Sequence, residues 1–168
     1  LKRHGCDELQ GFYFSKPIDS VCAEKILADK KNLQMDSQNE DDLQQTLLLV
    51  DDEMNIIRSL ERLLRNEGYR IFTANSAGEA LQIMARHHVQ VILSDQRMPE
   101  TSGTELLKKV KDLYPDTIRM ILSGYTDINT VTEAVNSGWL YKFLVKPFDN
   151  KELKKQILDA FDVYTLNK

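Results

Sequence analysis

Five polar residues lie just after apolar runs, and their types could do chemistry together. They are Asp51, Asp52, Asp95, Ser123 and Lys146. Three carboxylates that lie close together repel one another, and their pKa values would rise unless a cation lay between them. A hard divalent ion such as Mg²⁺ takes oxygen ligands, commonly one or two carboxylates together with a phosphate oxygen. If these residues converge in the fold, they predict a magnesium site suited to phosphoryl chemistry.

Ser123 and Lys146 would complete such a site. Lys146 supplies a positive charge for one phosphoryl oxygen, and Ser123 supplies a hydroxyl donor for another. Alone, each of the five residues has an ordinary structural interpretation as a helix cap, a turn residue, a backbone hydrogen-bond partner or a solvated charge. The site therefore depends on their convergence. The sequence has no glycine-rich phosphate loop, so a bound nucleotide is not expected.

The elements that must position these residues are apolar runs that alternate with amphipathic stretches. The predicted strands are Leu47–Val50, Tyr69–Ala74, Val89–Asp95, Ile118–Leu122 and Trp139–Val145. Helical spacing predicts helices over 56–64, 77–85 with Ser76 as its cap, 102–114, 127–136, and after Asp149. Unbroken apolar strands suit a parallel sheet covered on both faces, with right-handed crossovers. The carboxyl ends of the strands, and the polar residues after them, then meet at one edge.

The composition limits the classes of partner and compartment. With 168 residues, of which 42% are hydrophobic, the chain can form one core and a small appendage. A net charge of −4 and a pI near 5.4 argue against bulk attraction to nucleic acid or to an anionic membrane, and no apolar run could span a bilayer. Cys6 and Cys22 have no metal-ligand spacing and no secretory signal ahead of them, so we expect free thiols in the reducing cytoplasm.

The first 45 residues differ in character from the rest. Residues 1–30 have too little apolar surface to fold alone, and Leu1 is not an initiator methionine, so we expect a piece of a longer protein. The run Gln10–Pro17, QGFYFSKP, resembles the end of EAL domains, the TIM-barrel phosphodiesterases of cyclic di-GMP. That resemblance implies that residues 1–30 are the C-terminal tail of such a domain, whose metal-binding residues would lie upstream. Residues 31–45 are polar and acidic and are interpreted as a linker, either flexible or helical.

Residues 46–163 resemble the receiver domain of two-component response regulators. The resemblance rests on the acidic pair, the third-strand aspartate followed by Met98-Pro99 and Gly103, the small hydroxyl residue and the Lys-Pro pair, all in order. It implies a flavodoxin-like α/β fold, in which a doubly wound five-stranded parallel sheet has (βα)5 order. The chain departs from the family pattern in Gly124, where alanine is commoner.

The resemblance also implies the ligands of the site. Asp95 would accept a phosphoryl group from a histidine kinase or a phosphotransfer protein. The implied Mg²⁺ ligands are Asp51, Asp52, Asp95 and the backbone carbonyl of Arg97. Asp52 would bind the ion directly and Asp51 would bind it through water.

Further roles follow from the same resemblance. Ser123 and Lys146 would hold the phosphoryl group, and Ser123 would act with Phe143 as a switch. Phe143 lacks the hydroxyl that some switch aromatics carry. The bond between Lys146 and Pro147 is expected to be cis.

These observations predict a phosphorylation-controlled signalling module behind an EAL domain, with regulation of cyclic di-GMP hydrolysis as its output. The alternative is a stand-alone adaptor that docks partner proteins through the face formed by residues 125–161. The same face is a candidate surface for a homodimer. The fragment itself is not expected to be an enzyme, beyond assisting its own phosphorylation and dephosphorylation.

Overall fold

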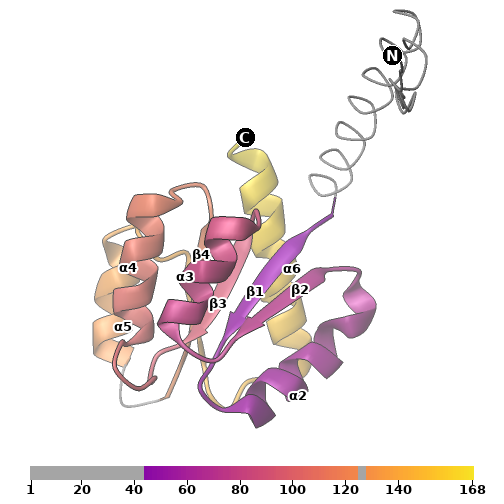
Figure 1. The fold of residues 1–168 in the computed structure, drawn as a ribbon, viewed down its shortest axis with the longest axis horizontal. Helices are drawn as coiled ribbons and strands as arrows, with labels where there is room; N and C mark the ends of the chain where they lie inside the picture. The colour runs from indigo at the N-terminus through magenta and orange to yellow at the C-terminus, as the bar shows by residue number, and fades with distance from the viewer. Residues whose placement is uncertain (1–43, 125–127) are drawn as a thin grey trace, which may run out of the picture. The chain divides into compact units, whose positions relative to one another are not determined.

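The computed structural model describes residues 44–124 and 128–168, with only the backbone given for residues 128–131. The described residues form one parallel sheet in the order β2-β1-β3-β4-β5, with helices on both faces (Figure 1). The strands are β1 (Thr46–Val50), β2 (Arg70–Ala74), β3 (Val91–Asp95), β4 (Ile118–Ser123) and β5 (Lys142–Val145). The helices are α2 (Met54–Leu64), the 3-10 turn η1 (Arg65–Glu67), α3 (Ala77–Arg86), α4 (Gly103–Leu113), α5 (Ile128–Asn136) and α6 (Asn150–Leu166). The predicted flavodoxin-like sheet is confirmed.

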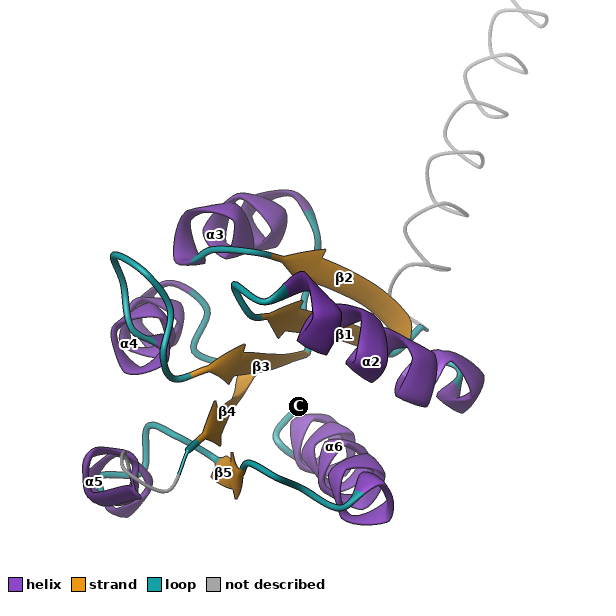
Figure 2. Ribbon diagram, turned by 90° about the horizontal axis from the view of Figure 1, so that it is seen from below, coloured by secondary structure: helices purple, strands orange, loops and turns teal. Residues whose placement is uncertain are grey.

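The strands divide the core into two layers, one on each face of the sheet. Leu47 and Leu49 of β1 belong to a buried cluster with residues of α2 and α6, whereas Leu48 belongs to a cluster with residues of α3 and α4. Figure 2 shows α2 and α6 on one side of the sheet and α3, α4 and α5 on the other. Because successive side chains of a strand point to opposite faces, a strand buried on both sides must be apolar throughout.

Side-chain caps begin three of the helices. Ser76 accepts a hydrogen bond from the N–H of Glu79 at the start of α3, as predicted. At α4, Ser102 and Glu105 form a reciprocal capping box, which satisfies two backbone donors at the helix start. Asp149 caps α6. No side-chain bond caps α2, so Asp52 does not serve as its cap.

The fifth strand begins later than the sequence predicts. The predicted start at Trp139 is wrong, and β5 begins at Lys142. The N–H of Leu140 donates to the carbonyl of Ala134 in α5, and the carbonyl of Trp139 accepts a hydrogen bond from Arg119 Nε at 2.7 Å. Residues 139 and 140 are buried and apolar, but these bonds tie them to α5 and to a side chain rather than to the sheet ladder.

Some predictions fall on residues that the structure does not describe. The predicted EAL tail at residues 1–30, most of the predicted linker at 31–45, and the predicted start of the fourth helix at residue 127 lie outside the described ranges. Within those ranges, no helix is both long enough and apolar enough to cross a membrane.

Gly103, the first residue of α4, allows this helix to approach the end of β3 closely. A Cβ atom at this position would collide with the backbone carbonyl oxygen of Asp95. The N–H of Gly103 donates to the carbonyl of Gln96 at 3.1 Å. The start of α4 is therefore fixed against the strand end that carries Asp95, and only glycine fits there.

Replacing Gly103 by alanine should destabilise the fold, because the backbone of α4 or β3 must move to accept the new Cβ. We expect Gly103→Ala to lower the free energy of unfolding by about 1–3 kcal/mol in urea titrations followed by circular dichroism. The matched control is Gly78→Ala, since a Cβ there meets nothing within 4 Å and the site is inside α3. The free energy of unfolding of this control should rise by about 0.5–1 kcal/mol. Equal stabilities of Gly103→Ala and the parent would contradict the prediction.

Candidate functional site

The carboxyl ends of four neighbouring strands bring the predicted site residues to one edge of the sheet. Asp51 follows β1, Asp95 ends β3, Ser123 ends β4 and Lys146 follows β5. The strands are parallel and adjacent in the order β1-β3-β4-β5, so their carboxyl ends point the same way. The predicted convergence is therefore present for these four residues.

Lys146 joins the two buried carboxylates of this edge. Its Nζ lies 2.6 Å from Oδ1 of Asp95 and 3.1 Å from Oδ2 of Asp51. The side chain reaches from the end of β5 past β4 to the ends of β3 and β1. One ammonium group therefore makes two charge-assisted hydrogen bonds at the centre of the site.

Each carboxylate is also held by the backbone turn that follows it. Oδ1 of Asp51 accepts the N–H of Glu53 at 2.9 Å, and Oδ2 of Asp95 accepts the N–H of Arg97 at 2.7 Å. Aspartate side chains commonly bond the amide two residues ahead in this way and so fix a turn. One oxygen of each carboxylate thus accepts the turn amide, and the other oxygen accepts the Lys146 ammonium group. These bonds fix the orientation of both carboxylate planes.

The site carries an excess of negative charge in a poorly solvated place. Asp51 is only 2% exposed and Asp95 only 6%. Burial raises the pKa of Asp51, although the Glu53 amide and the charge of Lys146 oppose the rise. Burial alone would lower the pKa of Lys146, but hydrogen bonding and charge from Asp95, with the charge of Asp51, outweigh it and raise that pKa. Lys146 therefore stays positively charged at neutral pH.

The remaining predicted residues differ in their exposure and in their hydrogen bonds. Asp52 is exposed. Ser123 is fully buried, its hydroxyl donates to the carbonyl of Gly124 at 3.1 Å, and its own carbonyl accepts the N–H of Lys146 at 2.8 Å. Phe143 is half-buried on β5, beside a hollow of about 440 Å³ that it lines with Val135 of α5, Tyr141 and Lys142. The bond between Lys146 and Pro147 is cis, as predicted.

The donor chemistry of the site fits a small divalent cation, although Lys146 is the cation that the structure shows there. Carboxylate oxygens from Asp51 and Asp95 and the backbone carbonyl of Arg97 are hard donors of the kind that Mg²⁺ prefers. The two buried carboxylates outweigh the single ammonium group, so a further positive charge is favourable. Among residues 44–124 and 128–168, however, no three His, Cys, Asp or Glu side chains are close enough to hold a metal ion. Asp52 does not complete such a cluster.

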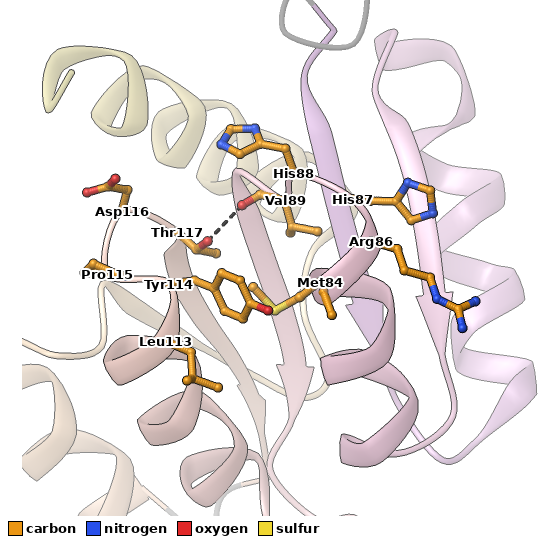
Figure 3. Close-up of a pocket in the computed structure, with 11 residues that line it drawn as sticks. Met84, Arg86, His87, His88, Val89, Leu113, Tyr114, Pro115, Asp116 and Thr117 are labelled. Atoms are coloured by element: carbon orange, nitrogen blue, oxygen red, sulfur yellow. Dashed lines mark hydrogen bonds between the residues drawn. The ribbon is translucent and has the colours of Figure 1, made fainter. Parts of the chain in front are cut away.

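A separate pocket of about 430 Å³ lies at the opposite edge of the sheet, where α3 and α4 end (Figure 3). It is lined by residues 84–89 and 113–117. The His87 ring stacks on Phe72 with ring centres 4.4 Å apart, and Nε2 of His88 lies 3.1 Å from the hydroxyl oxygen of Tyr164. None of the predicted site residues lines this pocket, so it does not belong to the acidic site.

Sequence reasoning missed two features of the site. It assigned Lys146 to a phosphoryl oxygen but did not anticipate that its ammonium group bridges both carboxylates. It also overlooked Gln96, whose side chain bonds to Thr104 in α4. The only available signal was position, since Gln96 directly follows Asp95 and Thr104 directly follows Gly103.

The fold and the site together define an α/β protein of flavodoxin-like topology with an acidic centre at the carboxyl ends of its strands. A family model described as the response regulator receiver domain matches residues 47–158. The chain belongs to this receiver family.

The curated relatives extend well beyond the matched region. The hydrogenase transcriptional regulatory protein HoxA of Cupriavidus necator is 42% identical over 125 residues, which cover 74% of this chain and 26% of that protein. HoxA of Bradyrhizobium diazoefficiens is 36% identical over 126 residues, which cover 75% of this chain and 26% of that protein. The chain spans about a quarter of the length of these relatives.

Solved structures show the same fold. A response regulator receiver domain protein from Clostridium thermocellum superposes with a TM-score of 0.69 at 29% identity, covering 73% of this chain and 98% of that chain. The signal receiver domain of an HD domain-containing protein from Pseudomonas fluorescens Pf-5 has a TM-score of 0.69 at 32% identity, with the same coverage of 73% and 98%.

Replacing Asp51 by asparagine should stabilise the metal-free protein near neutral pH. Because burial raises the pKa of Asp51 above its ordinary value of 3.8, the ionised carboxyl is less favourable in the folded chain than in the unfolded chain. The stability that Asp51 confers is therefore full below the ordinary pKa and is lost as the pH rises through the folded-state pKa. Asparagine keeps the oxygen that accepts the Glu53 amide.

We expect Asp51→Asn to raise the free energy of unfolding near pH 7, with the gain shrinking toward about pH 3. Urea titrations across this range, with a chelator present, measure the effect. Asp52→Asn is the control, since it removes the neighbouring carboxylate, which is exposed. If Asp51→Asn raised the free energy of unfolding by the same amount at every pH, ionisation of the Asp51 carboxyl would not be the cause of the gain.

Proposed function

We propose that the chain is the phosphoacceptor module of a two-component pathway, with Asp95 as the phosphorylated residue. The observation that carries the proposal is the position of the Asp95 carboxylate, which lies at the sheet edge within 2.6 Å of the Lys146 ammonium group. A carboxylate oxygen of Asp95 would attack the phosphorus of a phosphohistidine on a kinase or phosphotransfer protein. The phosphorus–nitrogen bond breaks, its electron pair goes to the imidazole nitrogen, which takes a proton from water, and an acyl phosphate forms on Asp95.

The neighbouring residues would stabilise the transferred group. Lys146 keeps its charge and can bind a phosphoryl oxygen. The Ser123 hydroxyl, which now donates to the Gly124 carbonyl, can instead donate to a second phosphoryl oxygen. Asp51, Asp52 and Asp95, with the backbone carbonyl of Arg97, are the residues proposed to hold Mg²⁺. When bound, the ion supplies positive charge that offsets the phosphoryl oxygens.

Phosphorylation is proposed to act on the face formed by α5, β5 and α6. Drawing Ser123 toward the phosphoryl group would free space beside β4, into which Phe143 could turn. The hollow beside Phe143 and its half-buried position on β5 support this route. Because packed side chains prefer discrete arrangements, a small shift can select between two surfaces on this face. The same face is the proposed surface for partner proteins or for a homodimer.

The output of the whole protein is a further proposal. The QGFYFSKP run at Gln10–Pro17 supports an EAL domain before the receiver, and hence regulation of cyclic di-GMP hydrolysis in the cytoplasm. The second candidate is transcriptional control, which the names of the HoxA relatives favour. The chain matches only 26% of the length of those relatives. Their names describe whole proteins, most of whose length has no counterpart in the matched region.

The two outputs can be separated with the intact protein. Titration of phosphodiesterase activity on cyclic di-GMP, with and without a phosphoryl donor, tests the EAL proposal directly. A donor-dependent change in hydrolysis supports it. No hydrolysis in either state, together with donor-dependent binding to promoter DNA, would favour the second output.

Small phosphodonors should label Asp95 in the presence of Mg²⁺. Acetyl phosphate or phosphoramidate should add one phosphoryl group to the parent, as seen by intact-mass spectrometry, and a chelator should prevent the reaction. Asp95→Asn should take no label, because an amide is a poor nucleophile for phosphorus. Asp112→Asn, which removes an exposed carboxylate of α4, is the control and should be labelled like the parent. Normal labelling of Asp95→Asn would refute the proposed phosphoacceptor.

A stable phosphoryl mimic should change hydrogen exchange in residues 132–145, which include the end of α5 and all of β5. The ligand shifts a two-state equilibrium by its differential affinity, so changes equivalent to about 1–3 kcal/mol are expected. Beryllofluoride with Mg²⁺ is the mimic, and exchange in α3 serves as the internal reference. Changes confined to residues 1–45 would contradict this route.

A further inference from the structure

The side chain of Gln96 ties the end of β3 to the start of α4. Its Oε1 accepts the hydroxyl of Thr104 at 2.6 Å and the backbone N–H of Thr104 at 3.2 Å. Gln96 is only 9% exposed. A buried glutamine oxygen with two donors from the same residue forms a defined contact rather than a loose surface interaction.

The backbone of Gln96 is fixed as well. Its N–H donates to the carbonyl of Leu122 in β4 at 2.9 Å, and its carbonyl accepts the N–H of Gly103 at 3.1 Å. Gln96 therefore bonds to β4 on one side and to α4 on the other. The loop of residues 97–102 leaves the fold at Gln96 and returns to it at Gly103, so Gln96 closes the base of that loop.

This loop begins with Arg97, which serves the acidic site through its backbone. The N–H of Arg97 holds Oδ2 of Asp95 at 2.7 Å, and the carbonyl of Arg97 is a proposed Mg²⁺ ligand. The N–H of Arg97 belongs to the peptide bond that joins Arg97 to Gln96, and the Arg97 carbonyl belongs to the next peptide bond. Any movement at the base of the loop would therefore shift a ligand of the ion and the amide that orients the phosphoacceptor.

We propose that the bond between Gln96 and Thr104 is a latch that positions the Arg97 backbone for Mg²⁺ binding and for orienting Asp95. Gln96 and Thr104 are positioning residues, because neither is assigned a contact with the ion or with the phosphoryl group. The inference rests on the proposed function of the acidic site. It adds to that function the residues that hold the site in its working geometry.

The bond from the Thr104 N–H also caps one backbone donor of α4, but a role as a helix cap does not account for the bond from the Thr104 hydroxyl. The start of α4 already has a reciprocal capping box between Ser102 and Glu105. Ser102 satisfies the N–H of Glu105, and the Glu105 carboxylate satisfies the N–H of Ser102. Gln96, which lies outside the helix, accepts both the backbone N–H and the hydroxyl of Thr104. The link therefore joins the helix to β3, which a cap inside the helix would not do.

The test compares two variants of Thr104 in the full chain. Thr104→Val removes the hydroxyl and keeps the shape, whereas Thr104→Ser keeps the hydroxyl. Because outer partners of metal ligands commonly change metal affinity by 10–100-fold, Thr104→Val should weaken Mg²⁺ binding about tenfold in isothermal titration calorimetry. Thr104→Ser should stay close to the parent. The amide of Arg97 should exchange faster with solvent in Thr104→Val than in Thr104→Ser.

A second variant makes the test independent of one substitution. Gln96→Met has a similar length but no acceptor, and it should weaken Mg²⁺ binding as Thr104→Val does. Thr104→Val removes the hydroxyl bond of this residue pair, and Gln96→Met removes both the hydroxyl bond and the backbone N–H bond. The double variant should therefore lose no more affinity than Gln96→Met alone. Ser76→Ala removes the cap of α3 and is the matched control for lost stability. It should leave Mg²⁺ affinity and Arg97 exchange unchanged.

The outcomes separate the latch from the proposed function. If the parent binds Mg²⁺ but Thr104→Val and Gln96→Met bind it equally well, or if both only lose stability as Ser76→Ala does, the latch is refuted. If the parent binds no Mg²⁺, the proposed function fails, and amide exchange at Arg97 alone decides whether the latch exists. Unchanged Arg97 exchange in both variants would refute it in that case.

Discussion

The pairing of one ammonium group with two buried carboxylates is the interaction on which the rest of the structure depends. Lys146 reaches Asp95 and Asp51 from a different strand end, so the pair exists only if β1, β3 and β5 keep their order and register. Burying charged groups costs free energy unless they are paired and hydrogen-bonded. For Asp51 this cost is not fully offset, because burial raises the pKa of this carboxyl. For Lys146 the two carboxylates more than offset burial and raise the pKa of the ammonium group. The unfavourable charge is therefore that of Asp51, and perturbed carboxyl groups of this kind are common at functional sites.

A parallel sheet covered on both faces provides the rigidity that this arrangement requires. The two buried clusters pack Leu47–Val50 of β1 and Val91–Leu93 of β3 against helices on both faces of the sheet, so the strand ends have little freedom. Beyond the strands, the polar turns begin at once. The amides of Glu53 and Arg97 hold the outer oxygens of the two carboxylates, so the position of each side chain is determined by its own backbone.

The sequence predicts those parts of this structure that depend on periodicity and topology. Apolar runs identify the strands, and parallel strands bring Asp51, Asp95 and Lys146 to one edge. The start of β5 could not be predicted, because Trp139 and Leu140 are as apolar as a strand and only their hydrogen bonds place them outside the ladder. The bridge made by Lys146 depends on the conformation of a long flexible side chain. The contact of Gln96 with Thr104 depends on how a loop returns across eight residues, which no local pattern encodes.

The charge of the site also indicates how Lys146 would respond to the proposed phosphorylation of Asp95. In the structure, its single positive charge is shared between two carboxylates. In the proposed phosphorylated state, the Asp95 carboxylate becomes a neutral acyl group that carries a phosphoryl group of about two negative charges. The strongest negative charge then lies farther from β1, on the phosphoryl group. The Lys146 ammonium group is attracted more strongly to this group than to Asp51. Moving Lys146 from Asp51 toward the phosphoryl group would leave Asp51 buried without its cation, and the proposed Mg²⁺ would then supply the missing positive charge. Because Lys146 directly follows β5, its backbone connects the acidic site to the strand that carries Phe143.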